Sequence, residues 1–182
     1  MIENTFIEDL IIFTPKVFHD NRGYFFESYN KKTFENLYIK KINFVQDNES
    51  FSNYGVIRGI HMQLLPFEQS KLVRVLEGKI LDIAVDLRRN SQTFGKHFSI
   101  ELSSENKKQL FIPKGFGHGF SVLSKTAIVS YKCDEFYNKD SEYGITFNDK
   151  DLNIDWKIPI KDQIIGEKDL KNLSFKDFLK QT

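Results

Sequence analysis

Short stretches of the chain alternate between apolar and polar residues and are separated by turn residues. The alternation is clear in residues 71–75 and 82–88, and a period of two is typical of strands that bury one face. The same reasoning predicts strands at 10–13, 23–29, 55–63, 71–76, 79–87, 97–102, 109–113, 118–123 and 127–136. Many short strands at such spacing predict an all-β fold, either a sandwich or a barrel.

Turn and helix signals complete this outline. Glu77-Gly78-Lys79 predicts a β-hairpin and residues 103–106 predict the next turn, so we expect antiparallel pairing. Residues 31–37 predict a short surface helix. The segment from about 167 to 179 carries apolar side chains among charges and predicts one or two short helices packed on the body. The polar stretch after Tyr137 is expected to be a covering loop.

The composition fits a β-rich protein and limits its partners. Eighteen phenylalanines and seven tyrosines suit the half-buried surfaces of strands. A length of 182 residues predicts one domain, residues 1–182. With 26 basic and 25 acidic residues the net charge is +1, which provides no drive toward nucleic acid or an anionic membrane. Any bound anion must therefore be small and held locally.

Three features of the sequence predict the compartment. Cys133 is the only cysteine, so an internal disulfide cannot form, which favours a reducing environment. The acidic residues 1–9 do not look like a signal peptide, and no apolar run approaches the ~20 residues of a membrane span. We therefore expect a cytoplasmic protein.

A base-capable imidazole, His61, stands three residues after a cation, Arg58, in one predicted strand. Because side chains alternate along a strand, we expect Gly59, His61 and Gln63 on the same face. Lys71 begins the next predicted strand, and burying two cations beside an imidazole costs free energy unless an anion compensates. The combination predicts proton abstraction from an anionic substrate such as a phosphate ester, although a lone strand histidine is more often structural.

A second histidine, His118, lies among the glycines of residues 113–120, where the backbone must pass close to a neighbour. A small barrel with two histidine-bearing strands also resembles metal-binding cupins. Those proteins carry His-x-His followed by Glu, whereas this chain has His61-Met62-Gln63, and glutamine is a poor transition-metal ligand. We therefore expect no metal. His19 and His97 have no such surroundings and are expected to be structural.

Several other candidates have a plain structural interpretation beside a functional one. Tyr131 is either a core aromatic residue or a general acid. Asp169 is either a charge at the start of the C-terminal helix or a site residue. Phe18, Phe136 and Tyr137 are ordinary core or surface rings, or faces on which a nucleobase stacks.

Taken together, these segments resemble the dTDP-4-dehydrorhamnose 3,5-epimerase family. The resemblance runs from about residue 10 to residue 170, in the family's order and spacing, and it rests on residues 17–29, 46–48, 55–63, 71–74, 86–95, 113–120, 131–132 and 147–149. It implies a metal-free, cupin-type jelly-roll barrel with short peripheral helices and no cofactor. It also implies a homodimer that exchanges N-terminal strands. The implied reaction is epimerisation at C3 and C5, beside the C4 ketone of a dTDP-4-keto-6-deoxy-glucose type sugar, in dTDP-L-rhamnose-type biosynthesis.

The resemblance also implies roles for individual residues. His61 is the base, held by Asp169; Tyr131 is the acid on the opposite face of the sugar; and Lys71 faces the enolate oxygen. The matching substrate-binding positions are Arg22, Glu27, Gln46, Asn48, Arg58, His118, Glu142 and Lys168. Phe18 of the partner subunit and the pair Phe136-Tyr137 would flank the thymine.

Two positions depart from the family pattern, and three other functions remain open. Met62 stands where many members have an aromatic residue, and Phe136 replaces the first tyrosine of a common pair. The first alternative function is epimerisation at C3 or C5 alone. The others are a non-catalytic cupin that binds a sugar nucleotide and a metal-dependent cupin oxygenase.

Overall fold

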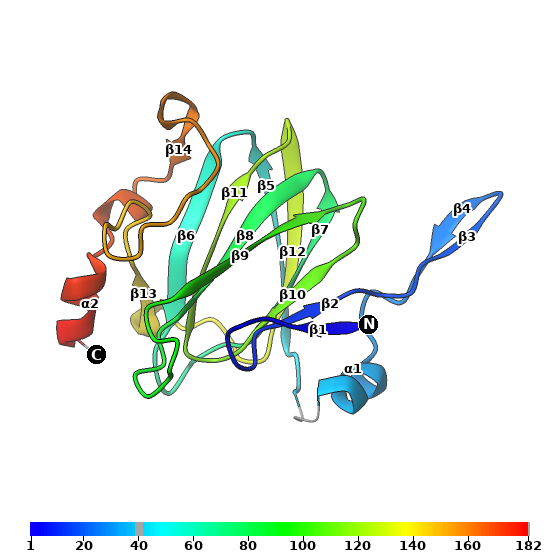
Figure 1. Cartoon of the computed structure of the whole chain (residues 1–182), viewed down its shortest axis with the longest axis horizontal. Coiled ribbons are helices and arrows are strands. Elements are labelled where there is room, and N and C mark those ends of the chain that lie inside the picture. Colours follow the sequence, from blue (N-terminus) through cyan, green and yellow to red (C-terminus); the bar gives the residue numbers. More distant parts are fainter. Residues whose placement is uncertain (39–41, 182) are drawn as a thin grey trace.

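The computed structural model describes residues 1–38 and 42–181, and most of their strands lie in two six-stranded sheets that face each other (Figure 1). The first sheet has the order β1 (Ile2–Asn4), β2 (Ile11–Phe13), β10 (Gln109–Ile112), β7 (Lys71–Glu77), β12 (Thr126–Cys133), β5 (Gln46–Asn53). The second has the order β13 (Glu142–Gly144), β6 (Val56–Gln63), β11 (Phe116–Val122), β8 (Lys79–Asp86), β9 (His97–Ser103), with β14 (Ile164–Ile165) parallel to β6. The prediction of an all-β jelly roll is confirmed.

Consecutive strands mostly alternate between the two sheets, and the predicted hairpin at residues 77–79 was therefore wrong. β7 belongs to the first sheet and β8 to the second, so the two strands do not pair. Gly78 has φ +76°, and a Cβ atom there would stand 2.0 Å from the Thr126 carbonyl oxygen, so the chain crosses between the sheets in a tight space. A glycine turn signals a change of direction, but it does not specify which sheet the next strand joins.

The turn at residues 103–106 is confirmed, and it also crosses between sheets. Ser103 and Asn106 exchange hydrogen bonds there, from Ser103 N to Asn106 Oδ1 at 3.1 Å and from Asn106 N to Ser103 Oγ at 3.0 Å. The turn connects β9 in the second sheet with β10 in the first. Antiparallel pairing is confirmed for the named ladders except β14 with β6.

Short helices occur at both predicted places. α1 (Lys31–Tyr38) follows the N-terminal strands, and η3 (Asp169–Lys171) and α2 (Phe175–Gln181) lie near the C-terminus. Two further 3₁₀ turns are η1 (Lys139–Ser141) and η2 (Ile160–Asp162). Within the described ranges, no helix is long and apolar enough to cross a membrane.

Several strands that are polar or only two or three residues long do not show the alternating pattern and were missed. β5 is a polar edge strand, and β1, β13 and β14 are very short. The predicted strand at 23–29 extends only over β4 (Gly23–Phe25), which pairs with β3 (Phe18–Asp20). This β3–β4 arm projects away from the barrel (Figure 1).

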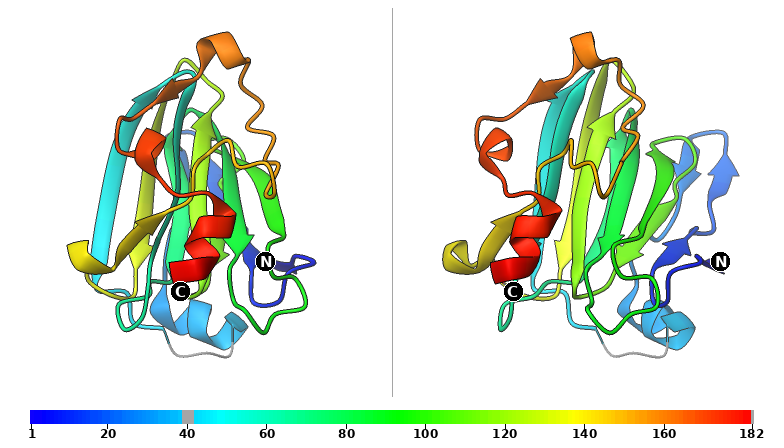
Figure 2. Two further views of the ribbon diagram at one scale, coloured as in Figure 1. Left: turned by 90° about the vertical axis from the view of Figure 1, so that its left-hand side faces the viewer. Right: turned by 60° about the vertical axis from the view of Figure 1, so that its left-hand side comes forward.

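Two large apolar clusters and a smaller one, around Phe34 and Phe111, hold the barrel together. The first lies between the sheets and includes Ile80, Ala84 and Val129, all fully buried. The second lies on the outer face of the second sheet, beneath the segment after residue 137, where Trp156 is buried. Figure 2 shows this segment, in yellow to red, beside β6 and β11. The polar stretch after Tyr137 therefore covers a sheet face, as expected.

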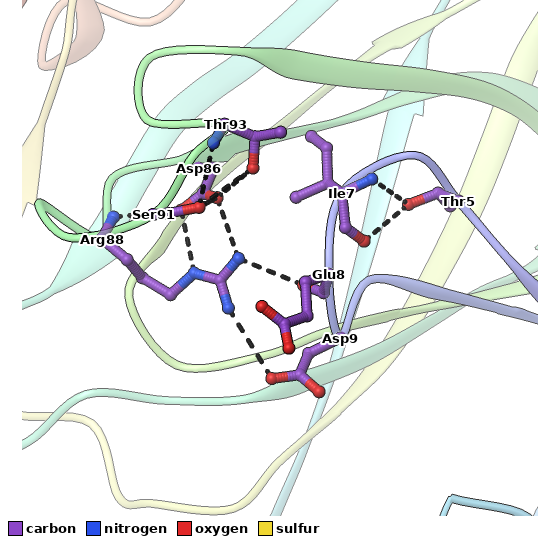
Figure 3. Close-up of polar contacts among 8 residues, drawn as sticks. All are labelled: Thr5, Ile7, Glu8, Asp9, Asp86, Arg88, Ser91 and Thr93. Atoms are coloured by element: carbon purple, nitrogen blue, oxygen red, sulfur yellow. Dashed lines mark hydrogen bonds and ion pairs between the residues drawn. The ribbon is translucent and has the colours of Figure 1, made fainter.

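A buried ion pair joins the N-terminal turn to the second sheet (Figure 3). Asp86 is fully buried and accepts hydrogen bonds from Arg88 Nε at 2.9 Å and Arg88 Nη2 at 2.8 Å. The hydroxyl groups of Ser91 and Thr93 donate to the same carboxylate at 2.6 and 2.7 Å. Arg88 also donates to the Glu8 carbonyl at 3.1 Å. Burial raises the pKa of Asp86, but these hydrogen bonds outweigh it and the net pKa lies below the usual value.

Candidate active site

A cavity of about 260 Å³ opens between the two sheets. It is lined by many of the predicted site residues: Gln46, Asn48, Arg58, His61, Lys71, His118, Tyr131, Tyr137 and Glu142. The remaining lining residues were not assigned to the site from the sequence: Ser50, Met62, Gln63, Gln69 and Phe120. The fold therefore brings residues from distant parts of the chain to one place.

Gly59 interrupts the regular pairing of β6 with β11. His118 lies opposite His61, and Phe120 lies opposite Arg58, so two steps along β11 match three along β6. An extra residue of this kind is a β-bulge, and bulges next to active sites redirect side chains. As a result, Arg58 and His61 both line the cavity.

Glycine is needed at this bulge because of its conformation and its neighbours. Gly59 has φ +126°, and a Cβ atom there would lie 2.5 Å from Gly119 Cα and 2.8 Å from the His118 carbonyl oxygen. The bulge leaves the Gly59 N–H free of the strand ladder, and it donates to Asp169 Oδ2 at 3.3 Å. The same feature thus shapes β6 and holds a carboxylate beside it.

His61 and Asp169 form a close pair, as the family resemblance implied. His61 Nε2 lies 2.6 Å from Asp169 Oδ1, and the side chains are 32% and 10% exposed. Burial raises the pKa of Asp169, but the hydrogen bonds from His61 and the Gly59 N–H, together with the charge of Lys168, outweigh it, so the net pKa lies below the usual value. The carboxylate is therefore ionised at neutral pH, and it fixes the Nε2–H tautomer of the ring. Nδ1 is then the ring nitrogen available to accept a proton.

Tyr131 and Lys71 come from the first sheet and face His61, which comes from the second. Lys71 Nζ lies 5.9 Å from the centre of the Tyr131 ring. Burial lowers the pKa of Lys71, and Cys133, its cross-strand neighbour, and Asp82 offset this only in part. Burial also raises the pKa of Tyr131, so the phenol keeps its proton at neutral pH. The cavity thus holds an imidazole on one wall and a phenol with a lysine side chain on the other.

Glu142 ties two loops together at the cavity. Its Oε2 atom accepts hydrogen bonds from Tyr137 Oη at 2.7 Å and from Lys168 Nζ at 2.5 Å. Burial raises the pKa of Glu142, but these two bonds lower it more, and the net pKa lies below the usual value. The Tyr137 N–H also donates to Gln46 Oε1 at 3.0 Å, which connects the loop to β5. Lys168, the residue next to Asp169, is therefore anchored to the cavity wall through Glu142.

Gln63 supports the site although sequence reasoning gave it no role. Its Nε2 donates to the carbonyls of Phe67 at 2.6 Å and Phe136 at 3.2 Å, and its Oε1 accepts from the Asn138 N–H at 2.6 Å. The signal was present in the sequence, because a buried glutamine on the same strand face as His61 requires partners. Gln63 fixes the loop that carries Tyr137.

Six predicted residues lie outside the cavity lining. Two of them, Asp169 and Lys168, contact the lining residues His61 and Glu142. Phe18 is 52% exposed on the β3–β4 arm, and Glu27 lies with it at a separate hollow. Arg22, at the tip of the same arm, pairs with Asp20 at 2.6 Å. Phe136 is 61% exposed and contributes its carbonyl to the site through Gln63.

The arrangement suits removal of a proton next to a carbonyl group. An ionised carboxylate orients a histidine, a cation faces it, and a protonated tyrosine stands across the cavity. In the part of the chain that is described, no group of three or more His, Cys, Asp or Glu is placed to hold a metal ion. A jelly-roll barrel with such a cavity defines the class of cupin-type isomerases that move protons.

Comparison with known proteins identifies the family. The family model for dTDP-4-dehydrorhamnose 3,5-epimerase matches residues 4–177. The epimerase of Shigella flexneri is 50% identical over 173 residues, which cover 95% of this chain and 94% of that protein. The crystal structure of the epimerase from Elizabethkingia anophelis superimposes with a TM-score of 0.94 at 56% identity, covering 97% of each chain. A structure from Legionella pneumophila in complex with dTDP-4-keto-L-rhamnose gives a TM-score of 0.93 at 44% identity, covering 97% of this chain and 93% of that one. The chain belongs to the dTDP-4-dehydrorhamnose 3,5-epimerase family.

Proposed function

We propose that the protein epimerises a dTDP-4-keto-6-deoxy-glucose type sugar at C3 and C5 through an enolate. The observation that carries this proposal is the His61–Asp169 pair, 2.6 Å apart, facing Tyr131 across the cavity. The complex of the Legionella relative with dTDP-4-keto-L-rhamnose supports the substrate class.

Each group performs one part of the reaction. His61 Nδ1 removes the proton from the carbon beside the ketone, while Asp169 stabilises the imidazolium that forms. The electron pair moves to the C4 oxygen, and the Lys71 ammonium stabilises the negative charge that develops there. Tyr131 then donates a proton to the opposite face of the same carbon, so the configuration is inverted. The ketone activates both neighbouring carbons, so the same groups serve C3 and C5.

The remaining polar and aromatic residues bind the nucleotide part of the substrate. Arg58 supplies donors for the diphosphate, consistent with the need for an anion beside buried cations, and His118 lines the same cavity. Tyr137 and Phe136 offer ring faces for the thymine, and Phe18 of the partner subunit would cover its other side.

We also propose a cytoplasmic homodimer that exchanges its N-terminal strands. The β3–β4 arm supports this, because Tyr24 and Phe25 on it are 57% and 67% exposed in the single chain. Light scattering combined with activity at decreasing protein concentration tests it. An active monomer that is stable to dilution would refute the exchange.

The reaction is tested by NMR of the protein with dTDP-4-keto-6-deoxyglucose in deuterated water. Deuterium should enter both C3 and C5, and this exchange should vanish in His61→Ala. Exchange at C3 alone would instead indicate a single-carbon epimerase. Nucleotide binding without exchange would indicate a binding protein, and elemental analysis of the purified protein tests the metal-dependent alternative.

A further inference from the structure

Asp82 is a buried carboxylate next to the cavity that the proposed mechanism does not use. It lies on β8, and its alternate neighbours Ile80 and Ala84 belong to the cluster between the sheets, so Asp82 also faces the interior. It is fully buried. Its Oδ1 atom lies 2.7 Å from His118 Nε2, whose side chain is 7% exposed. A fully buried carboxylate calls for an explanation, because a buried charge is costly unless it is paired.

The cavity therefore contains two histidine–carboxylate pairs side by side. His118 and His61 are direct cross-strand partners on β11 and β6, and both line the cavity. Each ring contacts its carboxylate through Nε2, His61 with Asp169 and His118 with Asp82. Because a carboxylate only accepts hydrogen bonds, each ring donates Nε2–H and keeps Nδ1 for the substrate.

The second oxygen of Asp82 has no hydrogen-bond partner within residues 1–38 and 42–181. A buried anion that is only half satisfied is costly unless a cation lies near it. Lys71 is such a cation: it lines the same cavity from the opposite sheet, and the negative charge of Asp82 acts on it. The other ionisable groups that act on Lys71 are Cys133 on β12 and Glu142 on β13.

These contacts lead to a role for Asp82 that rests on the proposed epimerase function. We propose that Asp82 is a positioning residue: it orients His118 toward the substrate and is the buried counter-ion that keeps Lys71 charged for stabilisation of the enolate. One carboxylate then orients His118 through Oδ1 and acts on Lys71 through the charge on Oδ2.

Asp82→Asn tests this role because asparagine has nearly the same shape and no charge. The rate of deuterium exchange should fall roughly 10- to 100-fold, a loss typical of residues that act through another group. The pH above which deuterium exchange declines, here called the alkaline limit, should move to a lower value in this variant, because Lys71 then loses its proton more readily. The matched control is Asp86→Asn, on the same strand and the same face, whose partners are Arg88, Ser91 and Thr93. That variant should lose stability and keep the wild-type pH limit.

A second measurement uses the unaltered protein and does not depend on the folding of a variant. The chain has four histidines, so their ring nitrogens can be resolved by ¹⁵N NMR. His118 should carry its proton on Nε2, so its Nδ1 should give the downfield ¹⁵N signal of an unprotonated ring nitrogen. An Nδ1–H tautomer of His118, or an Asp82→Asn enzyme with an unchanged alkaline limit, would overturn the inference while leaving the epimerase function intact. Absence of exchange in the wild-type protein would instead overturn both.

Discussion

Arg58 and His61 lie on the same side of strand β6 although they are three positions apart. Both line the cavity, because the bulge at Gly59 reverses the alternation between them. In a regular strand one of the two would point into the apolar layer beneath the C-terminal segment. The placement of this imidazole and this guanidinium in one cavity therefore depends on one glycine.

Gly59→Ala should disrupt both the fold and the site. The left-handed conformation and the contact with Gly119 predict a loss of about 3 kcal/mol in the free energy of unfolding. Urea denaturation measures this loss, and deuterium exchange measures the site. Gly166→Ala is the matched control, because nothing lies within 4 Å of the added methyl group. Equal stability of the two variants would contradict the role of the bulge.

Asp169→Asn should impair the reaction much more than substrate binding. Asparagine can occupy the same space, but it can offer an N–H where His61 needs an acceptor, which favours the wrong tautomer. We expect kcat to fall roughly 10²- to 10⁴-fold with little change in KM. Steady-state kinetics checks this, with Asp177→Asn as the control, since that carboxylate is exposed and contacts Ser174 and Lys180. A change confined to KM would show that Asp169 only binds substrate.

Tyr131→Phe should separate proton removal from inversion. His61 can still remove a proton and return a deuteron to the same face, so exchange into the substrate should continue. Formation of the epimerised product should fall roughly 100-fold or more, because the donor on the other face is missing. NMR follows both quantities in one sample, and Tyr54→Phe, at a 40% exposed tyrosine, is the control. Loss of exchange and product in equal measure would argue against Tyr131 as the acid.

Asp86 should make the fold sensitive to acid. Because its pKa is lower in the folded chain than in the unfolded one, its ionisation stabilises the fold fully above the unfolded value of about 3.8. This contribution decreases as the pH falls below that value and is lost below the folded pKa. Asp86→Asn should therefore cost about 3 kcal/mol at neutral pH and weaken the loss of stability in acid.

Thermal unfolding followed by circular dichroism between pH 7 and pH 3 tests this acid sensitivity. Asp177→Asn is again the control, because its carboxylate lies at the surface. Parallel curves for wild type and Asp86→Asn would mean that other carboxylates cause the acid sensitivity.

The period of two in the sequence was sufficient to find the apolar strands, but not to place them in sheets. β6 through β12 follow it because each buries at least one face, whereas β5 has a polar edge sequence and was missed. The wrong hairpin at Gly78 has a related cause. The residues of a turn determine its local conformation, whereas the sheet that the next strand joins depends on partners far along the chain. A chain that alternates between two sheets satisfies the same local pattern as a series of hairpins.

The residues of the candidate site could likewise be predicted only in part. His61, Lys71 and His118 could be suspected from their own segments, because charged or imidazole groups on a buried strand face need partners. The contact of His61 with Asp169 spans 108 residues and leaves no trace in local spacing, so only the family resemblance suggested it. Gln63 and Asp82 were visible as polar residues in strands, yet their roles depend on loops and strands that the sequence does not bring together.

The segment after residue 137 supplies the partner of the base and also covers the apolar outer face of the second sheet. During synthesis the barrel strands are made before this segment, so until it is made His61 lacks its Asp169 partner and the apolar face lacks its cover. A chain truncated before Asp169 would therefore lack the carboxylate partner of His61. It would also expose an apolar sheet face, which promotes aggregation. The C-terminal segment therefore completes both the proposed site and the cover of the apolar sheet face.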